Sequence, residues 1–160
     1  MTDETRTAAG SPSRREFLYA AGAAAATAAL PPRLSAEPAR RTRYAIVGTG
    51  HRGSGMWGAE ALRRHGDTLD LVALCDVNPQ RAEAANALMG TNAPVYADLD
   101  RMLDAVKVDR IAVCTVDSTH SAVIARALDR GVDVVTEKPM VTGLSQCRAI
   151  LDAERTNRRQ

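Results

Sequence analysis

Short apolar runs alternate with longer amphipathic stretches from residue 43 to the end of the chain. The runs are brief, near-continuously apolar and rich in β-branched residues, which predicts strands buried on both faces of a parallel sheet. The predicted strands lie at 44–47, 69–76, 94–96, 110–116 and 133–136. The stretches between and after them predict helices at 54–64, 80–89, 99–106, 119–130 and 142–155.

Local signals support this alternation of strands and helices. Asn78 followed by Pro79 is typical of a helix start, and Asp98 can cap the helix that follows it. Gly131 comes directly after a helical segment, where glycine commonly ends a helix in the left-handed conformation. Strand–helix–strand units with right-handed crossovers predict an α/β fold, a doubly wound parallel sheet in the order 3-2-1-4-5.

Composition limits the classes of function that fit the chain. Its 160 residues suffice for one domain with a core. A formal net charge of +2 and 3% aromatic residues give no basis for nucleic-acid binding. The three cysteines, Cys75, Cys114 and Cys147, have no metal-ligand spacing, so no metal site is expected.

The first 36 residues resemble a twin-arginine signal peptide. Arg14 and Arg15 precede an uncharged run at 17–30, and Pro31-Pro32 ends that run. The run fits a signal segment and is too short for a comfortable membrane span; an alanine-rich helix of the mature protein is the alternative. We therefore expect a signal at 1–36, a linker at 37–42, a Rossmann domain at 43–160, and export by the twin-arginine machinery to the periplasm or outside. No cysteine lies near the cleavage region, so no stable membrane anchor is expected.

A glycine-rich loop follows the first predicted strand. Gly48, Gly50 and Gly53 form G-x-G-x-x-G between a strand and a helix, which is the context that this dinucleotide-binding motif requires. The glycines allow a tight turn, close approach of a pyrophosphate, and packing of the helix on the strand. Free N–H groups and the helix dipole then face the phosphates. The backbone at His51 is expected near the phosphates, and Arg52 could add a charge contact.

An acidic residue stands at the end of the second predicted strand. Asp76 has the position at which a carboxylate accepts hydrogen bonds from the ribose hydroxyls. It would repel a 2′-phosphate, which favours NAD over NADP, although the nearby Arg81 weakens that inference. A glycine turn without a ligand is the alternative that strand, helix and Asp76 together argue against.

Three segments together resemble the Gfo/Idh/MocA family, the glucose–fructose oxidoreductase and inositol dehydrogenase group. They are "VGTGHRG" with "CDVNPQRA", then "CTVDSTHSAVIARALDRGVDVV", then Glu137-Lys-Pro-Met140. The resemblance covers residues 43–155. It implies a Rossmann domain followed by a larger substrate domain, and hydride transfer between a nicotinamide cofactor and a sugar or polyol.

The resemblance also implies roles for single residues. Lys138 matches the lysine beside the nicotinamide and the reacting hydroxyl, where it could assist proton removal. Glu137 would fix the cofactor or the lysine, and Pro139, often cis in this family, would set the backbone. Thr115 would line the cofactor, and His120 matches a histidine near the nicotinamide. Taken alone, Lys138 could also be a solvated lysine, and His120 a residue that merely caps or packs.

Two features depart from the family pattern. Val116 follows Thr115 where many members have proline, which leaves the role of Thr115 open. The chain up to Gln160 also lacks the sixth strand and the substrate domain that the resemblance implies, and the family's oligomer contacts lie largely on that domain, so a homo-oligomer stays open.

Three functions are therefore compatible with the sequence: the NAD-binding part of an exported sugar or polyol oxidoreductase, an NAD-dependent glycosidase of the same fold, or a non-catalytic nucleotide-binding remnant. Lys138 is the candidate catalytic residue. The candidate cofactor-binding residues are Gly48, Gly50, His51, Arg52, Gly53, Asp76, Thr115, His120, Glu137 and Pro139.

Overall fold

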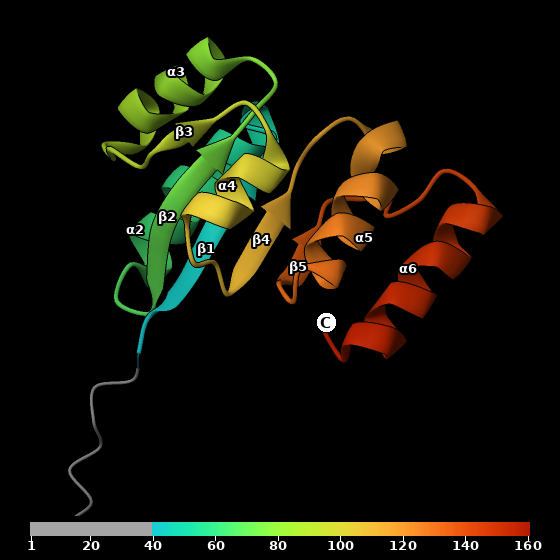
Figure 1. Cartoon of the computed structure of the whole chain (residues 1–160). Helices are drawn as coiled ribbons and strands as arrows, with labels where there is room; N and C mark the ends of the chain where they lie inside the picture. Colours follow the sequence, from blue (N-terminus) through green and yellow to red (C-terminus); the bar gives the residue numbers. More distant parts are fainter. Residues whose placement is uncertain (1–39) are drawn as a thin grey trace, which may run out of the picture. The chain divides into compact units, whose positions relative to one another are not determined.

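The computed structural model describes residues 40–160, in which helices flank a five-stranded parallel sheet (Figure 1). The twin-arginine segment at 1–36 and the first half of the expected linker, 37–39, lie outside these residues, so export stays a prediction. No helix within 40–160 is both long and apolar enough to cross a membrane.

Five strands and the helices between them follow the expected alternation. The strands are β1 (Thr42–Val47), β2 (Leu69–Cys75), β3 (Val95–Tyr96), β4 (Arg110–Val113) and β5 (Asp133–Thr136). The helices are the π-helical η1 (Arg52–Glu60), α2 (Ala61–His65), α3 (Pro79–Met89), α4 (Leu99–Ala105), the short 3₁₀ turn η2 (Asp117–Thr119), α5 (His120–Asp129) and α6 (Leu144–Asn157).

The sheet has the order β3-β2-β1-β4-β5, and every pair of neighbours is parallel. This confirms the expected doubly wound α/β arrangement with β1 at its centre. The carboxyl ends of β1 and β4 lie in register, with Val47 opposite Val113. The loops that follow these two strands therefore leave the sheet side by side, where ligands bind in folds of this kind.

The side chains of β1 alternate between two apolar layers. Ala45 and Val47 pack with α4, α5 and α6, in a layer centred on Met102, whereas Tyr44 and Ile46 pack on the other face with residues of η1, α2 and α3. Both faces of β1 are thus covered, as the continuous apolar run predicts for a central parallel strand. Burial raises the pKa of the Tyr44 phenol to about 12.

The expected helix signals are present. The Asn78 side chain accepts a hydrogen bond from the Gln80 N–H at the start of α3, and Asp98 accepts one from the Arg101 N–H at the start of α4. Gly131 has a φ of 72° directly after the last turn of α5. These features are predictable from the sequence because each depends only on residues close together along the chain.

Several boundaries differ from the expectation by one to three residues, and three of these differences have a visible cause. The first strand begins at Thr42 rather than 44 because Thr42 donates to the Thr68 carbonyl beyond the start of β2. The fourth strand ends at Val113 rather than 116, because the chain then turns across the glycine loop. The last helix begins at Leu144 rather than 142. Thr142 precedes it, and its N–H donates to the side chain of Gln146 in the first turn of that helix.

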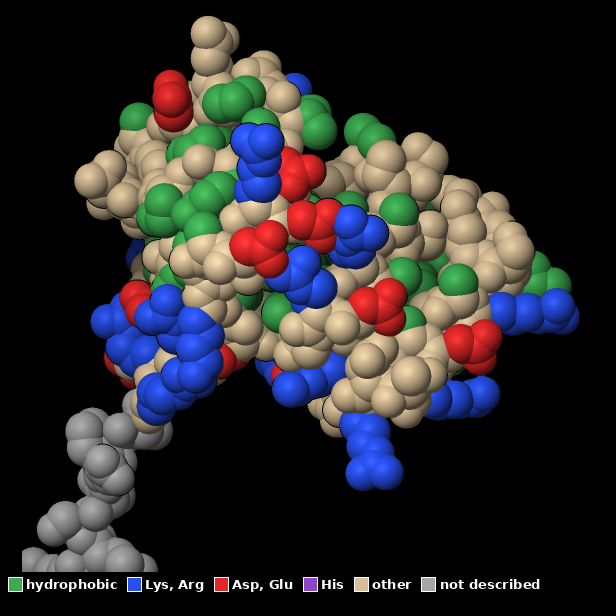
Figure 2. Space-filling view, viewed as in Figure 1, with side chains coloured by type: hydrophobic (Ala, Val, Ile, Leu, Met, Phe, Trp, Pro, Cys, Tyr) green, Lys and Arg blue, Asp and Glu red, His purple; other side chains and the backbone are tan. Residues whose placement is uncertain are grey.

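Charged pairs join α4 to α5 on the outer surface. Figure 2 shows acidic and basic side chains interspersed over these two helices. Arg126 is paired with Asp100, and Arg130 with Asp104 and Asp100. These side chains are largely solvent-exposed, and such pairs contribute little each.

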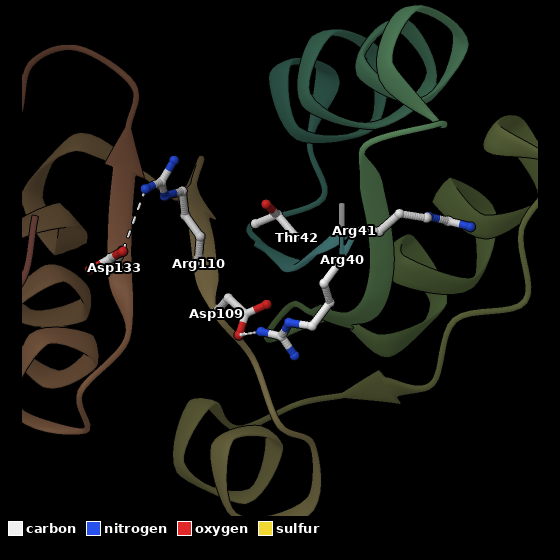
Figure 3. A pocket seen from close by; sticks show the side chains of 6 residues that line it. All are labelled: Arg40, Arg41, Thr42, Asp109, Arg110 and Asp133. Atoms are coloured by element: carbon white, nitrogen blue, oxygen red, sulfur yellow. Dashed lines mark hydrogen bonds and ion pairs between the residues drawn. The ribbon is translucent and has the colours of Figure 1, made fainter. Parts of the chain in front are cut away.

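The amino-terminal ends of the strands enclose a polar hollow of about 300 Å³ (Figure 3). The side chains that line it are Arg40, Arg41, Thr42, Asp109, Arg110 and Asp133. Its arginines already have acceptors: Arg40 pairs with Asp109 at 2.6 Å, Arg110 with Asp133 at 3.5 Å, and Arg41 donates to the Leu69 carbonyl. The arginines at this end of the sheet are therefore already bonded to acceptors within the protein.

Gly53 gives a direct test of the packing between β1 and η1. An added Cβ at Gly53 would stand 2.0 Å from the Gly48 carbonyl oxygen, whereas one at Gly55, in the same helix, would meet no atom within 4 Å. We expect Gly53→Ala to lower the free energy of unfolding by at least about 2 kcal/mol, and Gly55→Ala to leave it equal or slightly higher. Urea unfolding of the two variants measures this. Equal stability of both would contradict the close approach.

Candidate functional site

Gly48 begins the site, at the carboxyl end of β1. Its φ is 91°, in the region that favours glycine, and its N–H donates to the Cys75 carbonyl at 2.8 Å. An added Cβ would lie 2.6 Å from the backbone of both Cys114 and Thr115. Only glycine lets the chain after β4 cross at this distance, so the loops after β1 and β4 meet here.

The amino end of η1, which follows the glycine loop, is left without a protein cap. His51 precedes the helix with an exposed side chain that makes no capping hydrogen bond, and the first turn holds no acidic residue. An added Cβ at Gly50 would meet nothing within 4 Å, so the protein's own packing does not demand glycine there. Open space over uncapped N–H groups with a helix dipole behind them suits a phosphate. The loop therefore fits the pyrophosphate of a dinucleotide.

Asp76 lies at the end of β2 with 5% of its surface exposed. One carboxylate oxygen accepts from the N–H of Thr49 at 2.8 Å and from its hydroxyl at 2.9 Å, and the other accepts from the Asn78 N–H at 2.9 Å. Burial raises the pKa of this carboxyl, but the hydrogen bonds from Asn78 and Thr49, helped by Arg81 at 3.6 Å, lower it overall. The group is thus held as an anion in a fixed orientation against the glycine loop.

A second hollow, of about 440 Å³, opens at the carboxyl ends of β4 and β5. It adjoins the glycine loop, because Thr115 is one of the residues that cross Gly48. The residues that line it are Arg52, Cys114, Thr115, Asp117, His120, Glu137 and Lys138. Five of the predicted site residues therefore share one space, although they come from four separate segments of the chain.

Glu137 connects this hollow to η1. Its N–H donates to the Val113 carbonyl at 2.9 Å, which extends the pairing of β5 with β4 by one bond. Its carboxylate Oε1 accepts from Arg52 Nε at 3.1 Å, from Arg52 Nη2 at 2.8 Å and from the Trp57 indole Nε1 at 2.8 Å. The hydrogen bond from Arg52 lowers the pKa of Glu137 most, and the bond from Trp57 is the next largest cause.

His120 holds the loop beyond Lys138. The ring is 1% exposed; Nδ1 lies 2.8 Å from the Pro139 carbonyl oxygen and Nε2 lies 2.9 Å from the Thr115 carbonyl oxygen. The Lys138–Pro139 peptide bond is cis. His120 therefore joins the turn after β4 to the turn after β5, and both of its ring nitrogens face the backbone.

Lys138 is exposed at the edge of the hollow. Its ammonium forms no ion pair within 4.0 Å and no hydrogen bond to any residue in 40–160. Cys114 lies at the back of the same space, where burial first and the charge of Glu137 second raise the pKa of the thiol to about 12. The thiol is thus held protonated and unreactive, and Lys138 is left without a partner among residues 40–160.

The structure places the remaining predicted residues around these groups. Gly48 and Gly50 lie in the loop and Gly53 lies at the start of η1, whereas Asp76 is bonded to Thr49 and does not line the 440 Å³ hollow. Sequence reasoning did not single out Thr49 or Trp57, and it considered Cys114 as a metal ligand, which its spacing does not support. A polar residue beside the first glycine is a usable signal for Thr49, but the contact between Trp57 and Glu137, 80 positions apart, leaves no local signal. No cluster of three or more potential metal ligands occurs within 40–160.

Residues 42–160 match the model of the GFO_IDH_MocA family, an oxidoreductase family with an NAD-binding Rossmann fold. The chain belongs to this family. The Gfo/Idh/MocA resemblance expected from the three sequence segments is confirmed, and so is its NAD-binding Rossmann domain.

Among known proteins, the chain is 40% identical over 105 residues to an inositol 2-dehydrogenase of Klebsiella pneumoniae, a match covering 64% of the chain and 31% of that enzyme. A solved WlbA dehydrogenase of Bordetella pertussis, in complex with NADH and UDP-GlcNAcA, is similar with a TM-score of 0.70 and 29% identity, covering 76% of this chain and 36% of that one. A myo-inositol dehydrogenase of Lactobacillus casei, in complex with NAD(H) and myo-inositol, has a TM-score of 0.64 and 30% identity over 72% and 34%. The chain spans about a third of the length of these relatives.

The hydrogen bonds to Asp76 predict a pH-dependent stability. The carboxylate is favoured in the folded protein, so its contribution is fully present above the unfolded pKa of about 4 and is lost as the pH falls through the lowered folded pKa. We expect Asp76→Asn to lower the free energy of unfolding by about 1–3 kcal/mol at pH 7 and by less as the pH approaches 3.

Urea unfolding between pH 7 and pH 3 measures this difference. Asp67→Asn, a change at an exposed aspartate in the turn before β2, is the matched control and should have little effect at any pH. A loss for Asp76→Asn that is the same at both ends of the range would contradict the role of the charge.

Proposed function

We propose that this chain is the NAD-binding part of an enzyme that transfers hydride between NAD and a hydroxyl-bearing carbon of a sugar or polyol. The observation that carries the proposal is the exposed Lys138 side chain, without an ion-pair partner among residues 40–160, at the edge of a 440 Å³ hollow that adjoins the glycine loop. The inositol and sugar dehydrogenases among the relatives support it.

The residues present fit the cofactor. Gly50 leaves open space over the uncapped start of η1 for the pyrophosphate, and the Asp76 carboxylate lies at the end of the neighbouring strand for the ribose side. Two large apolar side chains in the loops after β2 and β4, Val77 and Val116, are 90% and 68% exposed and offer apolar surface to a flat base. When bound, NAD supplies the acceptor or donor of the hydride.

The chain's own contribution to the reaction is the handling of a proton. The Lys138 amine can take the proton of a substrate hydroxyl as hydride leaves the same carbon, or return it in the reverse direction. His120 links the two turns that line the hollow, because its ring nitrogens lie within hydrogen-bond distance of the Thr115 and Pro139 carbonyl oxygens. The fixed negative charge of Asp76 favours NAD over NADP.

NAD binding by the purified chain tests the cofactor part. We expect Gly50→Ala to weaken NAD binding about tenfold or more, because its methyl would occupy the space that the protein leaves empty. Gly55→Ala, which also meets no atom, should bind like the wild type, and Asp76→Ala should bind more weakly. Titration calorimetry measures all three. Unchanged affinity for NAD in both Gly50→Ala and Asp76→Ala would contradict the proposed binding of NAD by the glycine loop and Asp76.

Turnover tests the role of Lys138. In the protein as its source cells make it, assayed on a panel of inositols and sugars, Lys138→Ala should lower kcat by about 100-fold or more while the affinity for NAD changes little. Lys107→Ala, the same change at the chain's other lysine, is the control. Equal losses of turnover and of NAD affinity in Lys138→Ala would indicate a structural lysine instead.

A further inference from the structure

Glu137 is the immediate chain neighbour of Lys138 and its most obvious ion-pair partner. The two do not form a pair within 4.0 Å; the carboxylate is bonded instead to Arg52 and Trp57 of η1. Three N–H groups converge on one oxygen, Oε1, and 15% of the Glu137 side chain is exposed. The lysine carries the charge opposite to that of the carboxylate, and after the hydrogen bonds from Arg52 and Trp57 its charge also lowers the pKa of Glu137.

We propose that Arg52 and Trp57 hold the Glu137 carboxylate away from Lys138 and so keep the lysine amine free for the substrate. The catalytic role of this arrangement rests on the proposed function, but the hydrogen bonds themselves do not depend on it. Arg52 and Trp57 are then positioning residues for Lys138, acting through Glu137. Arg52 has a role at the lysine beyond the phosphate contact that the glycine motif suggests.

The chemistry of the donors makes them effective competitors for the carboxylate. A guanidinium presents N–H groups in a rigid planar fork, and the indole N–H can only donate, whereas a lysine ammonium is a flexible point charge. Arg52 and Trp57 also come from the same helix, five positions apart, so η1 fixes both donors together. All three bonds hold the carboxylate by Oε1, so losing either donor loosens its position and lets it turn toward its neighbour.

The backbone beyond Lys138 is held from the opposite side. His120, which starts α5, lies 2.8 Å from the Pro139 carbonyl oxygen. The residues on both sides of the lysine are thus held: the Glu137 side chain by Arg52 and Trp57 of η1, and the Pro139 carbonyl by His120 of α5. With both ends held, the lysine can meet the Glu137 carboxylate only if that side chain is released from η1.

Lysine reactivity measures this arrangement without substrate or cofactor. The sequence holds only two lysines, Lys107 and Lys138, so Lys107 is an internal reference in every sample. Trace acetylation with acetic anhydride consumes free amine, and a carboxylate paired with the lysine slows it by favouring the ammonium. Mass spectrometry of the two peptides gives the ratio of acetylation at Lys138 to that at Lys107.

We expect Arg52→Gln to lower this ratio by about threefold to tenfold, because the released carboxylate pairs with Lys138. Trp57→Phe should lower it less, since Arg52 keeps its two bonds. The double variant Arg52→Gln with Glu137→Gln should restore the wild-type ratio or exceed it. Arg52→Gln with Asp117→Asn should not, although Asp117 is the other carboxylate on the hollow.

Arg63→Gln is the matched control, because Arg63 is an exposed arginine whose partner, Glu60, has no bond to Glu137 or Lys138. Its ratio should equal that of the wild type. A wild-type ratio in Arg52→Gln would overturn the proposal. So would a lowered ratio that the added Glu137→Gln change fails to restore, since Arg52 would then act through folding. Failure of NAD binding with these ratios as expected would count against the proposed function alone.

Discussion

The close approach of three backbone segments at Gly48 determines the rest of the site. The chain after β4 crosses this glycine at a distance that leaves no room for a Cβ, and Gly53 brings η1 against its carbonyl oxygen from the other direction. One residue at the end of the central strand thereby fixes where the helix starts and where the fourth strand stops. The uncapped helix end and the hollow that holds Lys138 are neighbours for this reason, and a dinucleotide could reach from one to the other.

The sequence predicted the parts of the fold that depend on neighbouring residues. Apolar runs located all five strands, and the alternation with helices was enough to order the sheet, because right-handed crossovers leave few arrangements. The caps at Asn78 and Asp98 and the left-handed Gly131 follow rules that span a few positions. The end of β4 was misplaced by three residues, because the crossing over Gly48 ends the strand before the apolar run itself ends.

The candidate site was predictable in its residues but not in their connections. The glycines, Asp76 and the segment around Lys138 are recognisable in the sequence, since each has a characteristic spacing or composition. Their partners are not: Thr49 meets Asp76 across 27 positions, and Arg52 meets Glu137 across 85. Which arginine or which indole faces a carboxylate depends on how two segments are superposed in the fold, and no local pattern carries that information.

Arg52 shows how these connections change the reading of a motif. A basic residue inside a glycine-rich loop is naturally assigned to phosphate, yet its Nε and Nη2 are both directed at Glu137. Because 54% of the side chain stays exposed and a guanidinium has N–H groups besides these, the same residue can still face an anion over the helix start. A single side chain can therefore adjoin both the phosphate cradle and the support of Lys138. If a bound phosphate contacts Arg52, the proposal for Lys138 predicts that cofactor binding and the hold on Glu137 share this one guanidinium.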